Sequence, residues 1–122
     1  MVNSKIRVLY VDDEPFNLDI FKLTFKEKYE VHTALTAMDG LKLAAELEFP
    51  AIISDLKMPE MNGIQFLECV KAICPNSMRI IVTGMLDDSR VDKALDEGLI
   101  NSFIHKPWAK LEVIKVLDQA AS

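Results

Sequence analysis

Three aspartates stand directly after hydrophobic stretches of the sequence and are the residues best suited to chemistry. Asp12 and Asp13 follow one such stretch, and Asp55 follows another. If these stretches are strands of one sheet, the carboxylates meet at one edge, where like charges cannot all stay ionised in a low dielectric without compensation. A site with only oxygen ligands and few protein donors favours Mg²⁺. The acids therefore predict a magnesium site in which Mn²⁺ can substitute.

Two further residues at the ends of hydrophobic stretches complete a set that suits phosphoryl transfer. Lys106 brings a fixed positive charge, and Thr83 adds a hydroxyl donor. Transfer to an aspartate needs a carboxylate that attacks phosphorus and a metal that shields its charge. It also needs a cation and a hydroxyl for the equatorial phosphoryl oxygens. We therefore expect Asp55 to be the nucleophile, with Thr83 and Lys106 beside it.

A simpler interpretation is that acids at strand ends only cap helices. It fits the run 12–14, which stands immediately before Pro15, because acidic side chains are favoured at helix N-termini. Capping does not explain why Asp55 ends another stretch while Lys106 and Thr83 occupy equivalent ends.

The hydrophobic stretches themselves have the character of buried strands. They are short, rich in β-branched and aromatic residues, and bounded by polar residues, as strands of a parallel sheet are. The predicted strands span residues 5–11, 29–34, 51–54, 78–83 and 102–105.

The segments between these strands have helical periodicity. Pro15 suits the first turn of a helix that runs to about Lys28, and a second helix starts near Ala37. A third covers 64–73 and stops before Pro75. The fourth helix ends at Gly98, a plausible C′ residue, and the last spans 111–117 with Trp108 near its start.

Strand and helix thus alternate five times, which predicts an α/β fold with a doubly wound, five-stranded parallel sheet and helices on both faces. We expect a single domain over residues 1–122. In such open sheets the functional site lies outside the carboxyl ends of the strands, near the point where strand order reverses. This is where the acids and Lys106 are expected.

Composition narrows the class of protein. Half of the residues are hydrophobic, the net charge is −5, and the basic residues are scattered, so we expect a globular protein without direct nucleic-acid binding. The hydrophobic stretches are far shorter than the ~20 residues of a membrane span, and the N-terminus does not resemble a signal peptide. A cytoplasmic protein is the default expectation.

Two cysteines and two histidines have spacings that do not suggest a metal or redox site. Cys69 and Cys74 lie five positions apart, which suits neither CxxC chemistry nor zinc, so they are interpreted as small buried hydrophobic residues. His32 and His105 lack partners at zinc spacing. Packing or surface placement is the preferred interpretation of both.

Four segments of the chain together resemble the response regulator receiver family of bacterial two-component signalling, whose fold is flavodoxin-like. They are residues 8–15 (VLYVDDEP), 53–63 (ISDLKMPEMNG), 81–84 (IVTG) and 103–107 (FIHKP). The resemblance covers essentially the whole chain, and the four segments occur in the expected order at the expected strand ends.

The resemblance implies specific roles for the site residues. Asp55 would be the phosphoacceptor, and the metal would be bound directly by Asp13, by Asp55 and by the main-chain carbonyl of Lys57. Asp12 would act mainly through a metal-bound water. The hydroxyl of Thr83 would hold phosphoryl oxygens.

Lys106 would hold phosphoryl oxygens as well, and the peptide bond between Lys106 and Pro107 resembles the cis bond of the family. Phe103 would occupy the position of the aromatic switch that moves together with Thr83. The alternative is that Phe103 is a permanently buried core ring. Lys57 and Met85 stand where the family tunes phosphoryl lifetime, and Gly84 stands where alanine is frequent.

The resemblance also implies partners. Asp55 would accept its phosphoryl group, in a Mg²⁺-dependent reaction, from a sensor histidine kinase or a histidine phosphotransfer protein. The chain would be a signalling domain that assists its own phosphorylation and dephosphorylation, not an enzyme with turnover. It would then act on a downstream effector or an output domain, and a phosphorylation-dependent homodimer is a further expectation.

The resemblance further implies that the phosphoryl donor docks on the first helix, at Phe16 and Leu18, and that Pro107 and Trp108 belong to the same surface. Phe16 and Leu18 could instead be core residues.

Two other functions compete with this interpretation. A flavodoxin-like module could bind a flavin or nucleotide at the same edge of the sheet, but the sequence has no GxGxxG motif, Walker A loop or other phosphate cradle. A Mg²⁺-dependent phosphatase with a transient aspartyl-phosphate would use similar residues, and turnover of several small phosphomonoesters would distinguish it.

Overall fold

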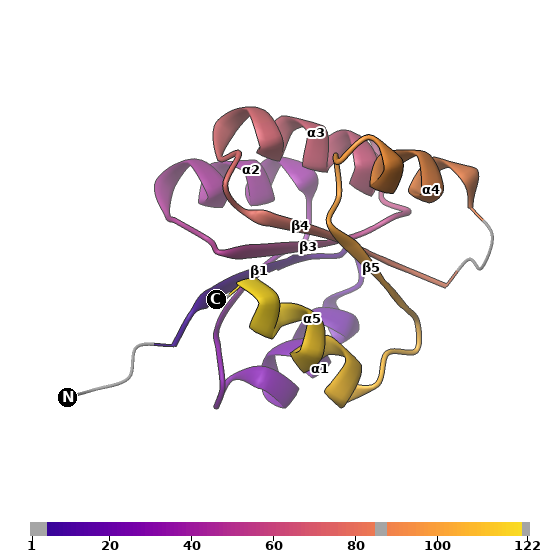
Figure 1. The fold of residues 1–122 in the computed structure, drawn as a ribbon. Helices are drawn as coiled ribbons and strands as arrows, with labels where there is room; N and C mark the ends of the chain where they lie inside the picture. The colour runs from indigo at the N-terminus through magenta and orange to yellow at the C-terminus, as the bar shows by residue number, and fades with distance from the viewer. Residues whose placement is uncertain (1–4, 85–87, 121–122) are drawn as a thin grey trace.

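The computed structural model describes residues 5–84 and 88–120, which form a parallel sheet between two layers of helices (Figure 1). The sheet has five strands in the order β2-β1-β3-β4-β5, and each neighbouring pair is parallel. The strands are β1 (Arg7–Val11), β2 (Glu30–Ala34), β3 (Ala51–Asp55), β4 (Met78–Thr83) and β5 (Ser102–His105). The predicted α/β fold class is therefore confirmed.

A helix follows each strand, as the periodicity predicts. The helices are α1 (Pro15–Phe25), α2 (Ala37–Glu46), α3 (Gly63–Ile73), α4 (Ser89–Asp96) and α5 (Lys110–Ala120). The first helix is shorter than expected, because Lys28 and Tyr29 donate their main-chain N–H groups to the carbonyl of Phe25 in a turn that leads into β2. Gly98 has φ +73° just beyond α4, as expected for a C′ residue.

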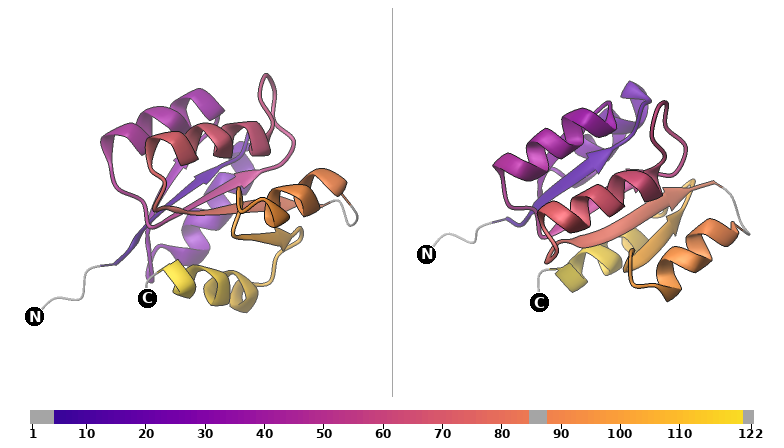
Figure 2. Two further views of the ribbon diagram at one scale, coloured as in Figure 1. Left: turned by 45° about the horizontal axis from the view of Figure 1, so that its top comes forward. Right: turned by 90° about the horizontal axis from the view of Figure 1, so that it is seen from above.

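The helices divide into two layers, each with its own hydrophobic core. One core joins α1 and α5 to one face of the sheet, and the other joins α2, α3 and α4 to the opposite face. The two views of Figure 2 show the same separation of the helices by the sheet. Side chains of β1, β3 and β4 contribute to both cores, which explains why apolar residues in these strands do not alternate with polar ones.

The order of the strands places the site. From β1 the chain first crosses to β2 on one side and then returns to β3 on the other, so strand order reverses between β1 and β3. Loops leave these two strands in opposite directions, and the edge between their carboxyl ends stays open for a site. The residues that follow β1 and end β3 are the predicted acids.

Within the described ranges, none of the helices is both long and apolar enough to cross a membrane.

A buried arginine holds the opposite end of the sheet together. Arg79 of β4 is buried and donates hydrogen bonds to four main-chain carbonyls, those of Pro75, Ser77, Gly98 and Leu99. Its guanidinium thus joins the segment after α3 to the turn after α4. Among residues 5–84 and 88–120 no carboxylate forms an ion pair with it.

We predict that Arg79→Lys lowers the free energy of unfolding by about 2 kcal/mol, because a single ammonium cannot replace a planar fork of donors and leaves buried carbonyls unpaired. Urea unfolding measures the change. The matched control is Arg90→Lys, since Arg90 is half exposed and pairs with Asp88, and it should leave the free energy of unfolding nearly unchanged. Equal losses in the two variants would contradict this role of Arg79.

Candidate functional site

The three predicted acids lie together at the carboxyl edge of the sheet. Asp12, Asp13 and Asp55 each place one carboxylate oxygen within 4.8 Å of the others. Asp12 is fully buried, Asp13 is half-buried and Asp55 is 9% exposed. The structure therefore confirms that sequence-distant carboxylates meet at one point.

Asp12 is held by protein donors on both of its carboxylate oxygens. Its Oδ1 accepts a hydrogen bond of 3.0 Å from the main-chain N–H of Glu14. Its Oδ2 accepts from the hydroxyl of Tyr10 at 2.9 Å, from Nδ2 of Asn17 at 3.1 Å and from Nζ of Lys106 at 3.3 Å. The orientation of this carboxylate is fixed by its neighbours.

Helix capping does not account for the acids before Pro15. The N-cap residue of α1 is Glu14, and its side chain makes no capping hydrogen bond. Asp12 accepts the main-chain N–H of Glu14 but uses its other oxygen within the site. Asp13 makes no hydrogen bond or ion pair with the residues that the structure describes, although it lies beside two other carboxylates.

Lys106 brings the only ammonium group that contacts these acids within the described residues. Its Nζ lies 3.2 Å from Oδ1 of Asp55 and 3.3 Å from Oδ2 of Asp12. The main-chain N–H of Lys106 donates to the carbonyl of Thr83 at 2.9 Å, which ties the loop after β5 to the end of β4. The bond between Lys106 and Pro107 is cis, as the resemblance implied.

The charge of Asp55 is opposed by burial and favoured by Lys106. Burial raises the pKa of the Asp55 carboxyl, Lys106 counteracts this rise, and the charge of Asp12 adds to it. The net pKa is above the ordinary value. A second positive charge near Asp55 would therefore stabilise its ionised form.

A glycine allows the next loop to pass close to Asp55. A Cβ atom on Gly63 would lie 2.3 Å from the main-chain oxygen of Asp55 and 2.9 Å from Cδ1 of Ile81. The N–H of Gly63 also donates to the carbonyl of Leu56 at 2.8 Å. The start of α3 is thereby packed directly against the end of β3.

The proposed switch residues lie on adjacent strands. Thr83 is buried at the end of β4 and pairs in register with His105 of β5. Phe103 is half-buried, packs partly against the core beneath α3 and α4, and contacts the ring of His105 edge-on at 5.3 Å. Phe103 is thus not a fully buried core ring in this structure.

The prediction that Leu18 lies on the partner surface is wrong. Leu18 is 6% exposed and belongs to the core beneath α1, because it faces the sheet, whereas Phe16 is 70% exposed. Of the two positions that the resemblance links to phosphoryl lifetime, Lys57 is exposed. The other, Met85, lies outside the described residues.

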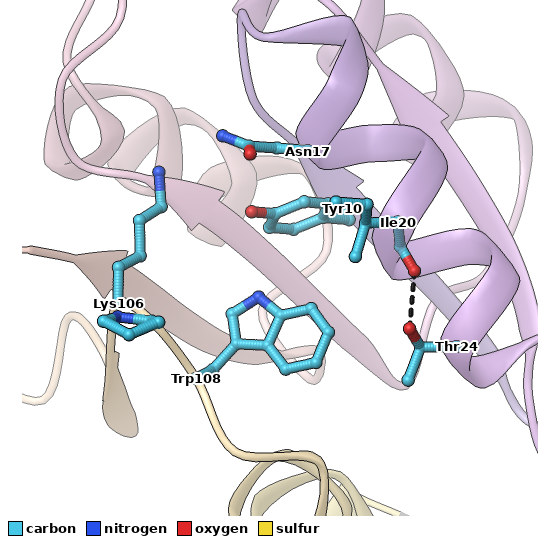
Figure 3. Close-up of a pocket in the computed structure, with 7 residues that line it drawn as sticks. Tyr10, Asn17, Ile20, Thr24, Lys106 and Trp108 are labelled. Atoms are coloured by element: carbon cyan, nitrogen blue, oxygen red, sulfur yellow. Dashed lines mark hydrogen bonds between the residues drawn. The ribbon is translucent and has the colours of Figure 1, made fainter.

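Pro107 and Trp108 line a pocket beside the acids (Figure 3). Its volume is about 580 Å³, and Tyr10, Asn17, Ile20, Thr24 and Lys106 complete its wall. The Trp108 ring contacts the rings of Phe21 and Phe25 of α1. Lys106 therefore belongs both to the pocket and to the acid site.

Sequence reasoning missed Tyr10 and Asn17, whose side chains hold Asp12. The available signal was spacing: Tyr10 stands two positions before Asp12 on the same face of a strand. Asn17 stands in the first turn of the following helix. Burial raises the pKa of the Tyr10 phenol, and the neighbouring charge of Asp12 adds to this rise.

The donor set fits a hard divalent cation. It consists of carboxylate oxygens, and the Asp13 carboxylate has no partner among the described residues. Oxygen donors with room for water molecules are what Mg²⁺ requires. No thiolate or imidazole joins the cluster within the described residues, so the set does not match a zinc site.

Comparison with known proteins agrees with this geometry. The family model described as "Response regulator receiver domain" matches residues 8–118. The chemotaxis protein CheY of Thermotoga maritima is 32% identical over 117 residues, which cover 94% of this chain and 97% of that protein. The chain therefore belongs to the response regulator receiver domain family, which is a family of signalling domains.

Other relatives are longer or are known as structures. The hydrogenase transcriptional regulatory protein HoxA of Cupriavidus necator is 30% identical over 98% of this chain, but this chain spans only 25% of that regulator's length. The signal receiver domain of an HD domain-containing protein from Pseudomonas fluorescens Pf-5 superposes with a TM-score of 0.88. It is 30% identical, over 96% of this chain and 94% of that one.

We predict that Asp55→Asn raises the melting temperature at neutral pH, by about 4 °C without divalent cations. The raised pKa means that the folded state holds the Asp55 proton more tightly than the unfolded state does. The corresponding stability is present below the ordinary aspartate pKa and is lost as pH rises through the raised pKa.

The advantage of the asparagine variant should therefore shrink as pH falls to about 4. Thermal unfolding between pH 4 and 8 in EDTA measures it. Asp96→Asn is the control, because Asp96 is exposed at the end of α4 and should show no such gain. An Asp55→Asn curve parallel to that of the wild type at all pH values would contradict the burial of charge.

Proposed function

We propose that this receiver domain accepts a phosphoryl group on Asp55 from a histidine kinase or a histidine phosphotransfer protein, in a Mg²⁺-dependent reaction. The observation that carries the proposal is the position of Asp55. Asp12 and Asp13 each bring a carboxylate oxygen within 4.8 Å of an oxygen of Asp55, and the Lys106 ammonium lies 3.2 Å from Oδ1 of Asp55.

In the proposed reaction an Asp55 carboxylate oxygen attacks phosphorus as the bond from phosphorus to the donor's histidine nitrogen breaks. Asp13, Asp55 and the Lys57 carbonyl would hold Mg²⁺, and the bound ion would supply positive charge for the phosphoryl oxygens and the attacking carboxylate. Asp12 would contribute to this site mainly through a water molecule, consistent with the protein donors that already occupy both its oxygens. Mn²⁺ serves in place of Mg²⁺.

Lys106 moves from the carboxylates to the phosphoryl oxygens in this proposal. Its ammonium is shared between Asp12 and Asp55 and is not committed to one partner. The Thr83 hydroxyl is the second donor to the phosphoryl group, since charge-assisted hydrogen bonds to phosphate oxygens are strong. Lys106 and Thr83 would thus both bind the phosphoryl group.

The donor protein is proposed to dock on α1 and the loop after β5. Phe16, Ile20 and Leu23 form an exposed apolar stripe at helical spacing on α1. Pro107 and Trp108 lie next to it across the pocket of Figure 3. An apolar stripe that reaches the rim of the site suits a helical partner that presents a phosphohistidine.

The downstream partner, a phosphorylation-dependent homodimer and a cytoplasmic location are further parts of the proposal. Relatives such as HoxA are named as transcriptional regulators, which favours an output domain or effector that responds to the receiver. Direct nucleic-acid binding by this domain is not proposed, because its net charge is −5.

We predict that acetyl phosphate and Mg²⁺ add one phosphoryl group to the wild-type protein, as seen by intact mass. Asp55→Asn should remove this labelling, because an amide is a poor nucleophile, and EDTA should suppress it in the wild type. Asp96→Asn should be labelled like the wild type. Full labelling of the Asp55→Asn variant would show that the nucleophile is wrongly assigned.

The Thr83 hydroxyl is proposed to couple phosphorylation to Phe103. When the hydroxyl moves toward the phosphoryl group, it vacates space near β5, and the half-buried Phe103 ring turns inward. The surface formed by α4, β5 and α5 then loses apolar area and changes what it binds.

We predict that Thr83→Ala is still phosphorylated but no longer transmits the change, because it keeps the nucleophile, the metal ligands and Lys106. NMR spectra with and without beryllofluoride should show shifts around Phe103 in the wild type that are much reduced in the variant. Equal shifts in both proteins would remove Thr83 from the switch.

A further inference from the structure

The hydroxyl of Tyr10 reaches Asp12 from the layer of α1. The Tyr10 ring is buried and stacks on Phe21 of α1, with ring centroids 4.4 Å apart and an interplanar angle of 22°. Figure 3 shows its hydroxyl pointing toward the end of Lys106, with Asn17 beside it. A ring locked in this way delivers its donor to one fixed place.

Three donors converge on a single oxygen of Asp12. Oδ2 accepts from Tyr10 at 2.9 Å, from Asn17 at 3.1 Å and from Lys106 at 3.3 Å. Two of these donors are neutral, and only Lys106 is charged. The same ammonium lies 3.2 Å from Oδ1 of Asp55, so the two neutral donors hold Oδ2 where it shares Lys106 with Asp55.

We propose that Tyr10, assisted by Asn17, is a positioning residue for the cation site: it fixes the rotation of Asp12 and limits how strongly Asp12 attracts Lys106. The inference rests on the proposed function, since it assumes that the acid cluster binds a divalent cation. Tyr10 touches neither the cation nor the phosphoryl group and acts only through Asp12.

The consequence of losing the hydroxyl follows from the shared position of Lys106. Without Tyr10 as a donor, the buried Asp12 carboxylate must satisfy Oδ2 with Asn17 and Lys106 alone. The carboxylate therefore shifts toward the ammonium and draws it from Asp55, which changes the position of Asp12 beside the cation site. Loss of such an outer partner typically lowers metal affinity by about tenfold or more.

The protein contains a matched control for a purely structural effect. Tyr29 is also buried, and its hydroxyl also donates to a carboxylate, Oδ1 of Asp118, at 3.1 Å. This pair joins the start of β2 to the end of α5, whereas Tyr10 lies in β1 beside the acids. Tyr29→Phe removes the same atom and the same kind of hydrogen bond away from the site.

The experiment compares Mn²⁺ affinity in the wild type, Tyr10→Phe, Tyr29→Phe and Asn17→Ala, measured from the EPR signal of free Mn²⁺. Melting temperatures without metal show whether each variant is folded. We expect about tenfold weaker binding in Tyr10→Phe, a smaller loss in Asn17→Ala, and wild-type affinity in Tyr29→Phe. Both tyrosine variants should lose a few degrees of melting temperature.

Unchanged or tighter binding in Tyr10→Phe would overturn the positioning role, and so would an equal loss in Tyr29→Phe. If Tyr10→Phe fails to fold, Asn17→Ala decides the question, since unchanged affinity there overturns the proposal. Asp13→Ala tests the cation site separately from the role of Tyr10, because it should abolish Mn²⁺ binding if the acids form that site. Absence of Mn²⁺ binding by the wild type would overturn the cation site and the role of Tyr10 together.

Discussion

Excess negative charge at one buried edge of the sheet is the constraint on which the rest of the structure depends. Asp12, Asp13 and Asp55 share this edge with one ammonium, that of Lys106. Burial makes each ionised carboxylate costly, and mutual repulsion adds to that cost. The site is therefore poised to gain stability from any added positive charge.

The two hydrophobic cores offset the cost of clustering the carboxylates. Each face of the sheet is covered by its own layer of helices, so β1 and β3 are held rigidly where they deliver the acids. Gly63 lets α3 begin directly against Asp55, and Arg79 joins the segments after α3 and α4 at the opposite end. The functional edge can then carry unfavourable charge, because the stabilising contacts lie elsewhere.

Lys106 connects the chemistry to the surface. Its ammonium contacts the carboxylates, while the residue also lines the pocket beside Trp108. Tyr10 has the same double position, since its hydroxyl holds Asp12 and its ring forms the pocket wall. A partner docked on α1 would therefore contact the same side chains that set the charge balance of the site.

The sequence by itself determined the fold class, the parallel sheet and the presence of Asp12, Asp13, Asp55, Thr83 and Lys106 at one edge. Buried parallel strands leave apolar runs that end where polar residues begin, and the ends of such strands meet at one edge whatever the details of packing. Helix boundaries were predicted less well, as for α1, because a turn closed by main-chain hydrogen bonds leaves no side-chain signal.

Only the tertiary structure decided which of the flanking residues face the site or the surface. It showed that Leu18 belongs to the core, whereas Phe16 is exposed, and that Tyr10 and Asn17 are the donors to Asp12. Helical periodicity gives the relative angle of two side chains but not the direction of the helix against the sheet. The direction is set by packing between elements distant in sequence, and so are the hydrogen bonds that those side chains make.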